Sequence, residues 1–167
     1  MDIANTNWYV FYTRPRSEKV VFNELVKRHY CVFLPLIKTF RRWKNRQNKL
    51  VSSVLFPGYI FVKTSGSEIF IIEQIPNIVY CVRFGQRPAV VPERDIECIE
   101  KMLGLDQEVY TEQDFAEGEH VRVVRGPLAG YEGILITYRG KHRFCIQLKD
   151  IRQCACIDIH SSMLEKA

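Results

Sequence analysis

The sequence predicts an α+β protein in two parts: an α/β sandwich, similar to ferredoxin-like folds, followed by a small β-barrel. The first part is predicted by apolar runs rich in β-forming residues, alternating with helical periodicity in the order β-α-β-β-α-β-α. The barrel is predicted by a change after Glu119, where the chain contains only short β-like runs with turns about every ten residues.

The first strand and helix are predicted within residues 8–28. Trp8–Tyr12 is rich in β-forming residues and runs into a turn-like segment at 13–16. Ser17 suits the N-cap of a following helix. Its apolar side chains recur at helical spacing, at Val21, Phe22, Leu25 and Val26.

The remaining elements of the sandwich follow the same reasoning. Residues 31–40 and 51–63 predict strands, and the polar segment 41–49 between them predicts the tip of a long hairpin. Pro57 and Gly58 interrupt the second of these strands, so we expect a bulge or a strand edge there. The sequence further predicts a short helix over 67–74, a strand over 78–84 and a helix over 92–103 that Gly104 ends.

An acidic segment separates the two parts. Residues 106–117 hold five acidic residues and no basic ones, and predict a linker. The barrel strands are predicted at 120–124, 133–138, 143–148 and 154–159. The glycine-rich segment 126–133 is not a phosphate loop, because it lacks a Lys-Ser/Thr pair and a strand follows it. We expect Gly133 instead to permit close backbone approach inside the barrel.

Charge is unevenly distributed along the 167 residues. The net charge is +5, but residues 1–105 carry 16 Lys and Arg against 9 Asp and Glu, and residues 106–167 carry 8 against 10. This asymmetry predicts a first half that faces a polyanion. No apolar run is long enough to span a bilayer and no signal-peptide segment is evident, so we expect a cytoplasmic protein that does not contact membranes.

The composition argues against metal binding and catalysis. The six cysteines mostly lie in apolar runs, where we expect them to act as small core residues in a reducing compartment. Cys154 and Cys156 are spaced too closely for a usual zinc ligand pair. The four histidines are scattered and no hydrolase motif occurs. We therefore expect no enzyme, no catalytic residue, no metal and no cofactor.

Aromatic residues accumulate in the predicted strands of the first half. Each could be core, yet together they exceed what one small core needs, and a surplus would mark a protein-docking surface. These residues are Trp8, Phe11, Tyr12, Phe56, Tyr59, Phe61, Tyr80 and Phe84.

Two basic clusters accompany these aromatics, and each is either a solvated surface or a nucleic-acid contact. One lies at the turn between the first strand and the first helix: Arg14, Arg16 and Lys19. The other lies at the hairpin tip: Arg41, Arg42, Trp43, Lys44 and Arg46. Trp43 favours nucleic acid, because a base can stack on an exposed aromatic ring.

Several of these motifs, in this order and spacing, resemble the NusG-like transcription elongation factors. They are the segments 8–10 (WYV), 33–35 (FLP), 55–62 (LFPGYIFV), 75–79 (IPNIV), 85–92 (GQRPAVVP) and the KOW-like segment 118–133. The sequences of 82–85 (VRFG) and 88–92 (PAVVP) are more similar to specialised paralogues, such as RfaH and the UpxY antiterminators, than to the general factor. The likeness therefore favours an operon-specific antiterminator.

The resemblance implies an NGN domain at 1–105, a linker at 106–117 and a KOW domain at 118–167. The NGN domain is implied to bind the β′ clamp helices of RNA polymerase, to reach the β subunit and to disfavour pausing. The implied polymerase-binding residues are Tyr12, Tyr59, Phe61 and Phe84, with Phe56 nearby. The basic turn at Arg14, Arg16 and Lys19 is implied to contact non-template DNA.

For the KOW domain the resemblance implies a ribosomal protein or a termination factor as partner. A rival interpretation is a ribosome-associated or RNA-binding protein, since KOW-like barrels and basic hairpins occur there too.

Overall fold

The computed structural model describes residues 6–42, 48–113 and 118–167. Its N-terminal sheet is antiparallel and has the order β2-β5-β1-β6, with the short strand β9 also paired to β1. The strands are β1 (Thr6–Thr13), β2 (Cys31–Phe33), β5 (Tyr59–Ser65), β6 (Ile78–Cys81) and β9 (Val90–Val91).

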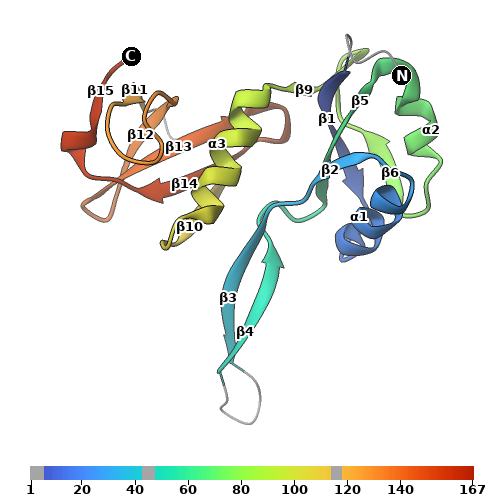
Figure 1. Cartoon of the computed structure of the whole chain (residues 1–167), viewed down its shortest axis with the longest axis horizontal. Coiled ribbons are helices and arrows are strands. Elements are labelled where there is room, and N and C mark those ends of the chain that lie inside the picture. The colour runs from blue at the N-terminus through green and yellow to red at the C-terminus, as the bar shows by residue number, and fades with distance from the viewer. Residues whose placement is uncertain (1–5, 43–47, 114–117) are drawn as a thin grey trace.

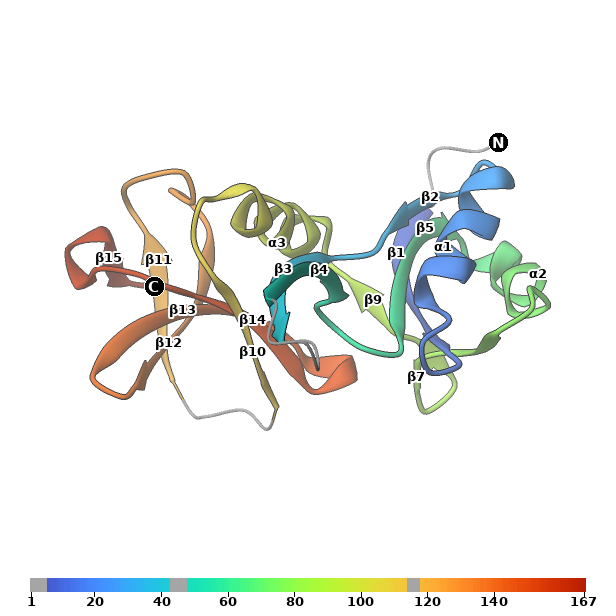
Figure 2. The same cartoon turned by 90° about the horizontal axis from the view of Figure 1, so that it is seen from below.

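One face of this sheet is covered by α1 (Glu18–Lys27) and by α2 (Ile69–Glu73), which follows the 3₁₀ turn Gly66–Glu68 (Figure 2). Alternation along the strands places every second side chain on this face. The helices contribute residues at helical spacing, and the resulting cluster contains Tyr9, Phe11, Val21, Leu25, Ile60, Val62, Ile69 and Ile72.

The opposite face belongs to a second and larger core. Trp8, Val10 and Phe61 from the sheet share one continuous buried cluster with α3 (Glu93–Gly104) and with the C-terminal strands. Helix α3 lies between the two parts of the molecule in both views (Figures 1 and 2). It therefore joins the N-terminal and C-terminal cores rather than serving the N-terminal sheet alone.

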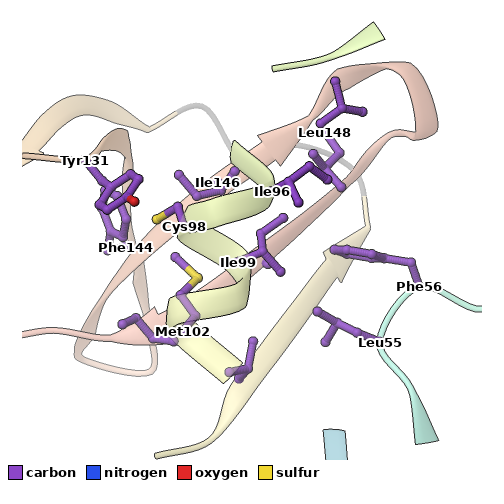
Figure 3. Packing of buried hydrophobic residues seen from close by; sticks show 14 of the residues in the cluster. Leu55, Phe56, Ile96, Cys98, Ile99, Met102, Tyr131, Phe144, Ile146 and Leu148 are labelled. Carbon is purple, nitrogen blue, oxygen red and sulfur yellow. The ribbon is translucent and has the colours of Figure 1, made fainter. Parts of the chain in front are cut away.

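Helix α3 packs against the C-terminal strands through an apolar stripe. Figure 3 shows Cys98, Ile99 and Met102 among residues of those strands, with Leu55 and Phe56 approaching from the N-terminal part. Tyr131 is held by cations from α3, since the Arg94 guanidinium and the Lys101 ammonium lie 5.6 Å and 4.9 Å from the ring centroid.

The two long strands predicted at 31–40 and 51–63 are each divided. The first becomes β2 and β3 (Leu36–Arg42), and the second becomes β4 (Asn48–Val54) and β5, with the break at Leu55–Gly58. Strands β3 and β4 form a separate hairpin that projects from the body (Figure 1). A further small hairpin joins β7 (Arg83–Phe84) to β8 (Arg87–Pro88).

The C-terminal part is a six-stranded antiparallel sheet, which we call the C-terminal sheet, with the order β10-β14-β13-β12-β11-β15. Its strands are β10 (Val109–Gln113), β11 (Glu119–Val123), β12 (Glu132–Tyr138), β13 (Lys141–Leu148), β14 (Gln153–Asp158) and β15 (Leu164–Lys166). The 3₁₀ turns Lys149–Ile151 and Ser161–Met163 lie between these last strands.

Two features of this sheet bear on the sequence expectations. Strand β10 lies inside the segment 106–117, for which the sequence predicts a linker, and it pairs with β14. Close backbone approach at Gly133 is confirmed, because a Cβ atom there would lie 2.5 Å from the Cys145 carbonyl oxygen. Within the described residues no helix is long and apolar enough to cross a membrane.

The expectation that the cysteines act as small core residues in reduced form is wrong for Cys31, which is exposed, and for one pair that is joined. Cys145 on β13 lies directly opposite Cys156 on β14, with 4.1 Å between their Cα atoms, and the two form a disulfide. The expectation suits Cys81 and Cys98, which are buried thiols. Burial raises the pKa of Cys81 to about 11 and that of Cys98 to about 12.

Candidate functional site

Three tyrosines lie side by side across the N-terminal sheet, and we call them the tyrosine row: Tyr59, Tyr12 and Tyr80. The strand register sets this arrangement, because Tyr12 on β1 pairs with Tyr59 on β5 and with Tyr80 on β6. The ring centroids are 5.5 Å apart for Tyr12 and Tyr59, and 5.3 Å apart for the stacked pair Tyr12 and Tyr80. The row leaves Tyr80 exposed and Tyr12 and Tyr59 half-buried.

Gly58 fits the backbone tightly against the tyrosine row. A Cβ atom at this position would lie 2.9 Å from Cε2 of Tyr12, and its φ of +86° is a conformation that favours glycine. The Gly58 carbonyl accepts a hydrogen bond of 2.8 Å from the Thr13 N–H, and its own N–H donates 2.7 Å to the buried carboxylate of Glu18. These bonds tie the loop before β5 to the start of α1.

A hollow of about 510 Å³ opens beside this junction, and it joins aromatic and basic side chains. Tyr12, Arg16 and Lys19 line one side, and residues 51–54 of β4 line another. Lys19 Nζ donates a hydrogen bond of 2.7 Å to the Ser52 carbonyl, so the basic side chain spans the opening between α1 and the hairpin.

The turn that carries the basic residues has a defined backbone. The Arg14 N–H donates 2.9 Å to the Asn77 carbonyl, and Arg16 adopts a left-handed conformation with φ 65°. The Ser17 N–H donates to the Arg14 carbonyl, which closes the turn immediately before α1. Arg14, Arg16 and Lys19 are all exposed and form what we call the basic turn.

The chemistry of this site is that of binding rather than of bond making. Burial raises the pKa of the Tyr59 phenol, and the neighbouring Tyr80 and Tyr12 act in the same direction. The Tyr59 hydroxyl therefore stays neutral at physiological pH. The tyrosine row offers ring faces and the neutral Tyr59 hydroxyl, and the basic turn offers cations suited to phosphate.

The structure separates the predicted polymerase-binding residues into two groups. Phe84 is 85% exposed on β7, and Tyr12 and Tyr59 belong to the tyrosine row. Phe56 and Phe61 are completely buried. The expectation that Phe61 contributes to an exposed face is therefore wrong, and Phe56, which was expected only near that face, lies in the core. Their rings meet edge to face at 6.0 Å within the core that also contains α3.

The predicted nucleic-acid residues are also divided. The basic turn is described in full and is exposed. The backbone of Arg41 and Arg42 ends strand β3. Trp43, Lys44 and Arg46 lie outside the described residues.

Tyr80 is among the surplus aromatics of the predicted strands but not among the implied polymerase-binding residues. The signal that pointed to it was its place in a predicted strand, and its position beside Tyr12 depends on the pairing of β1 with β6. Two further exposed apolar side chains lie on α2, at Phe70 and Ile71. In the part of the chain that the structure describes, no group of three or more His, Cys, Asp or Glu side chains is placed to hold a metal ion.

Comparison with known proteins supports the resemblance. The family model described as "NusG: Transcription termination factor nusG" matches residues 6–100. The "Transcription termination/antitermination protein NusG" of Halalkalibacterium halodurans is 27% identical over 143 residues, covering 77% of this chain and 80% of the relative. The protein of the same name from Bacillus subtilis is 29% identical over 141 residues, covering 76% and 78%.

A solved structure described as "Domain interaction in Thermotoga maritima NusG" matches over 97% of both chains, with 20% sequence identity and a TM-score of 0.53. This likeness confirms the predicted α+β fold class with an antiparallel C-terminal β region. The family model covers more than half of the sequence. The chain therefore belongs to the NusG family of non-enzymatic transcription factors.

Proposed function

We propose that this protein is an operon-specific transcription elongation and antitermination factor. It binds RNA polymerase through the tyrosine row and Phe84, and it binds non-template DNA through the basic turn. The relatives are named as transcription termination and antitermination proteins, which supports this class of activity. The observation that carries the proposal is the hollow at the junction of β1 and α1, where Tyr12 adjoins Arg16 and Lys19.

The aromatic side chains suit a protein partner. Exposed rings that cluster on one face bury a large apolar area when a partner covers them, and such residues dominate binding energies. Phe84 is a stronger candidate than the residues of the core, because its ring is almost fully accessible. The resemblance points to the β′ clamp helices as the surface that docks here, with the β subunit reached from the same domain.

The basic turn suits a nucleic acid. Three exposed cations within six residues attract a phosphate backbone, and release of counterions makes such binding depend on salt. The adjacent ring of Tyr12 offers a surface on which an unpaired base can stack. The stacking surface favours the single-stranded non-template DNA of an elongation complex, whose bases are unpaired, whereas the cations suit any phosphate backbone.

The mechanism requires no chemistry by the protein. A factor that binds the elongating conformation of polymerase more tightly than the paused conformation shifts the population towards elongation. Its effect is limited by this difference in affinity.

Two finer parts of the proposal rest on the resemblance. Specificity for an operon is supported by segments 82–85 and 88–92, which resemble specialised paralogues more than the general factor. We also propose that residues 1–105 and 118–167 act as NGN and KOW domains, and that the latter recruits a ribosomal protein or a termination factor.

Phe84→Ala tests the docking surface. We expect it to weaken binding to purified core polymerase by about 2 kcal/mol, or roughly 30-fold in Kd, without changing stability. Val26→Ala is the control, because Val26 is 46% exposed but lies on α1, which covers the opposite sheet face. Equal binding by Phe84→Ala and the wild type, or an equal loss in Val26→Ala, would contradict the docking surface.

A paused elongation scaffold tests the DNA contact. The double variant Arg16→Ala, Lys19→Ala should bind a scaffold with exposed non-template DNA more weakly and with less dependence on salt, whereas Lys27→Ala at the other end of α1 should not. A scaffold without exposed non-template DNA should bind the wild type and both variants alike. Tight binding to bare RNA without polymerase would instead support the rival RNA-binding function.

A further inference from the structure

Three cysteines lie together on one face of the C-terminal sheet, and we call them the cysteine cluster: Cys145, Cys154 and Cys156. They form a small buried core of their own, separate from the one that contains α3. Cys145 and Cys156 are directly opposite each other on β13 and β14 and are joined as a disulfide. Cys154 lies two residues before Cys156 on the same strand and therefore on the same face.

The register explains why one pair is joined and Cys154 is outside it. Cys154 lies opposite Gln147, so it is a diagonal neighbour of Cys145. Diagonal neighbours in an antiparallel pair are about 7–8 Å apart, which is at or beyond the Cα separation that a disulfide spans. Cys145 and Cys156, at 4.1 Å, are the pair that can close without moving the strands.

The cluster is covered by an edge strand rather than by the body of the protein. Strand β10 is one of the two edge strands of the C-terminal sheet, and Tyr110 on it pairs with Cys156. Tyr110 and Ile136 pack against the three cysteines. The Arg143 guanidinium lies 3.8 Å from the centre of the Tyr110 ring and holds the ring in place. Local opening of β10 would remove the Tyr110 side of this cover and leave Ile136 of β12 on the other.

We propose that the cysteine cluster is a redox modification site, at which Cys145 and Cys156 cycle between dithiol and disulfide by exchange with a low-molecular-weight disulfide such as oxidised glutathione. One thiol loses its proton, attacks the small disulfide and releases one small thiol, which leaves a mixed disulfide on the protein. The second protein thiolate attacks the mixed disulfide and releases the second small thiol. The two protein thiols lose two electrons and two protons, and the small disulfide gains them.

The disulfide involves β13, whose two faces belong to two different buried clusters. On one face of β13, Cys145 joins the strand to β14, and on the other face Phe144 and Ile146 belong to the core shared with α3. Oxidation therefore fixes β13 to β14 and stabilises the sheet on which β10 packs. Reduction leaves β10 held by its ladder with β14 and by the packing of Tyr110.

The full-length chain is equilibrated in buffers of defined reduced and oxidised glutathione ratio, quenched with acid, alkylated and mapped by peptide mass spectrometry. We expect a single reversible transition that joins Cys145 to Cys156. Cys154→Ser is the matched control and should retain it, whereas Cys145→Ser and Cys156→Ser should lose it. No disulfide at any ratio, a disulfide that excess reduced glutathione does not open, or a bond to Cys154 would each overturn the proposal.

Thermal unfolding and hydrogen exchange of the wild type test the proposal even if the serine variants fold poorly. Reduction of the wild type should lower the unfolding midpoint by about 5 to 10 °C and speed amide exchange in β10 and β14. Cys154→Ser should show the same difference between its two redox states. Identical midpoints and exchange rates for the oxidised and reduced wild type would contradict a coupling between the disulfide and the sheet.

Discussion

The substitution Phe56→Ala tests whether Phe56, in the aromatic segment 55–62, serves the core or the docking surface. The sequence places Phe56 beside the expected polymerase-binding residues, but the structure buries its ring completely. The ring meets Phe61 edge to face and belongs to the cluster that links the N-terminal sheet to α3. Removing it should therefore affect folding before it affects binding.

The magnitude follows from complete burial. Withdrawing a fully buried phenyl ring forfeits about 2 to 3 kcal/mol of transfer free energy, and the unfilled cavity adds to this. Loss of the edge-to-face contact with Phe61 contributes about 1 kcal/mol more. We expect the free energy of unfolding to fall by about 3 to 5 kcal/mol, which is a large share of the stability of an ordinary domain.

Urea unfolding monitored by circular dichroism and by tryptophan fluorescence, to which Trp8 of the same buried cluster contributes, measures this loss. Phe84→Ala is the control, since an 85% exposed ring should change stability by less than about 0.5 kcal/mol. A loss below about 1 kcal/mol in Phe56→Ala, or equal losses in the two variants, would refute the assignment of Phe56 to the core.

Three further predictions concern backbone contact and thiol chemistry. Gly58→Ala should destabilise the protein by about 1 to 2 kcal/mol and disturb the Tyr12 ring, because the added Cβ combines a positive φ with a 2.9 Å contact; urea unfolding and polymerase binding measure both effects. Gly133→Ala should cost about 1 to 3 kcal/mol, or more if the strands cannot separate, which thermal unfolding will show. At pH 8 Cys31, which is exposed, should react with a maleimide while Cys98 does not, because burial raises the pKa of Cys98 to about 12 and keeps it protonated; rapid labelling of both by mass spectrometry would contradict this.

The sequence by itself determined the local elements and the family. Apolar periodicity placed α1 and α3, and Gly104 ends α3 as expected. Pro57 and Gly58 marked the break between β4 and β5, and alternation along β5 put Tyr59 and Phe61 on one face. These features depend on interactions between residues close in the chain, so a single sequence contains the information needed to predict them.

Only the tertiary structure decided which side chains of that face remain accessible. Phe61 is buried in the core that includes α3, whereas Tyr59 stays half-buried beside Tyr12, and nothing in the alternation distinguishes them. Strand β10 could not be predicted from its acidic segment, because its partner β14 lies some forty residues later. The position of Cys145 opposite Cys156 likewise depends on the register of two strands. Register and burial depend on contacts between segments that are distant in the chain, and the free energy of these contacts cannot be predicted from a local sequence pattern.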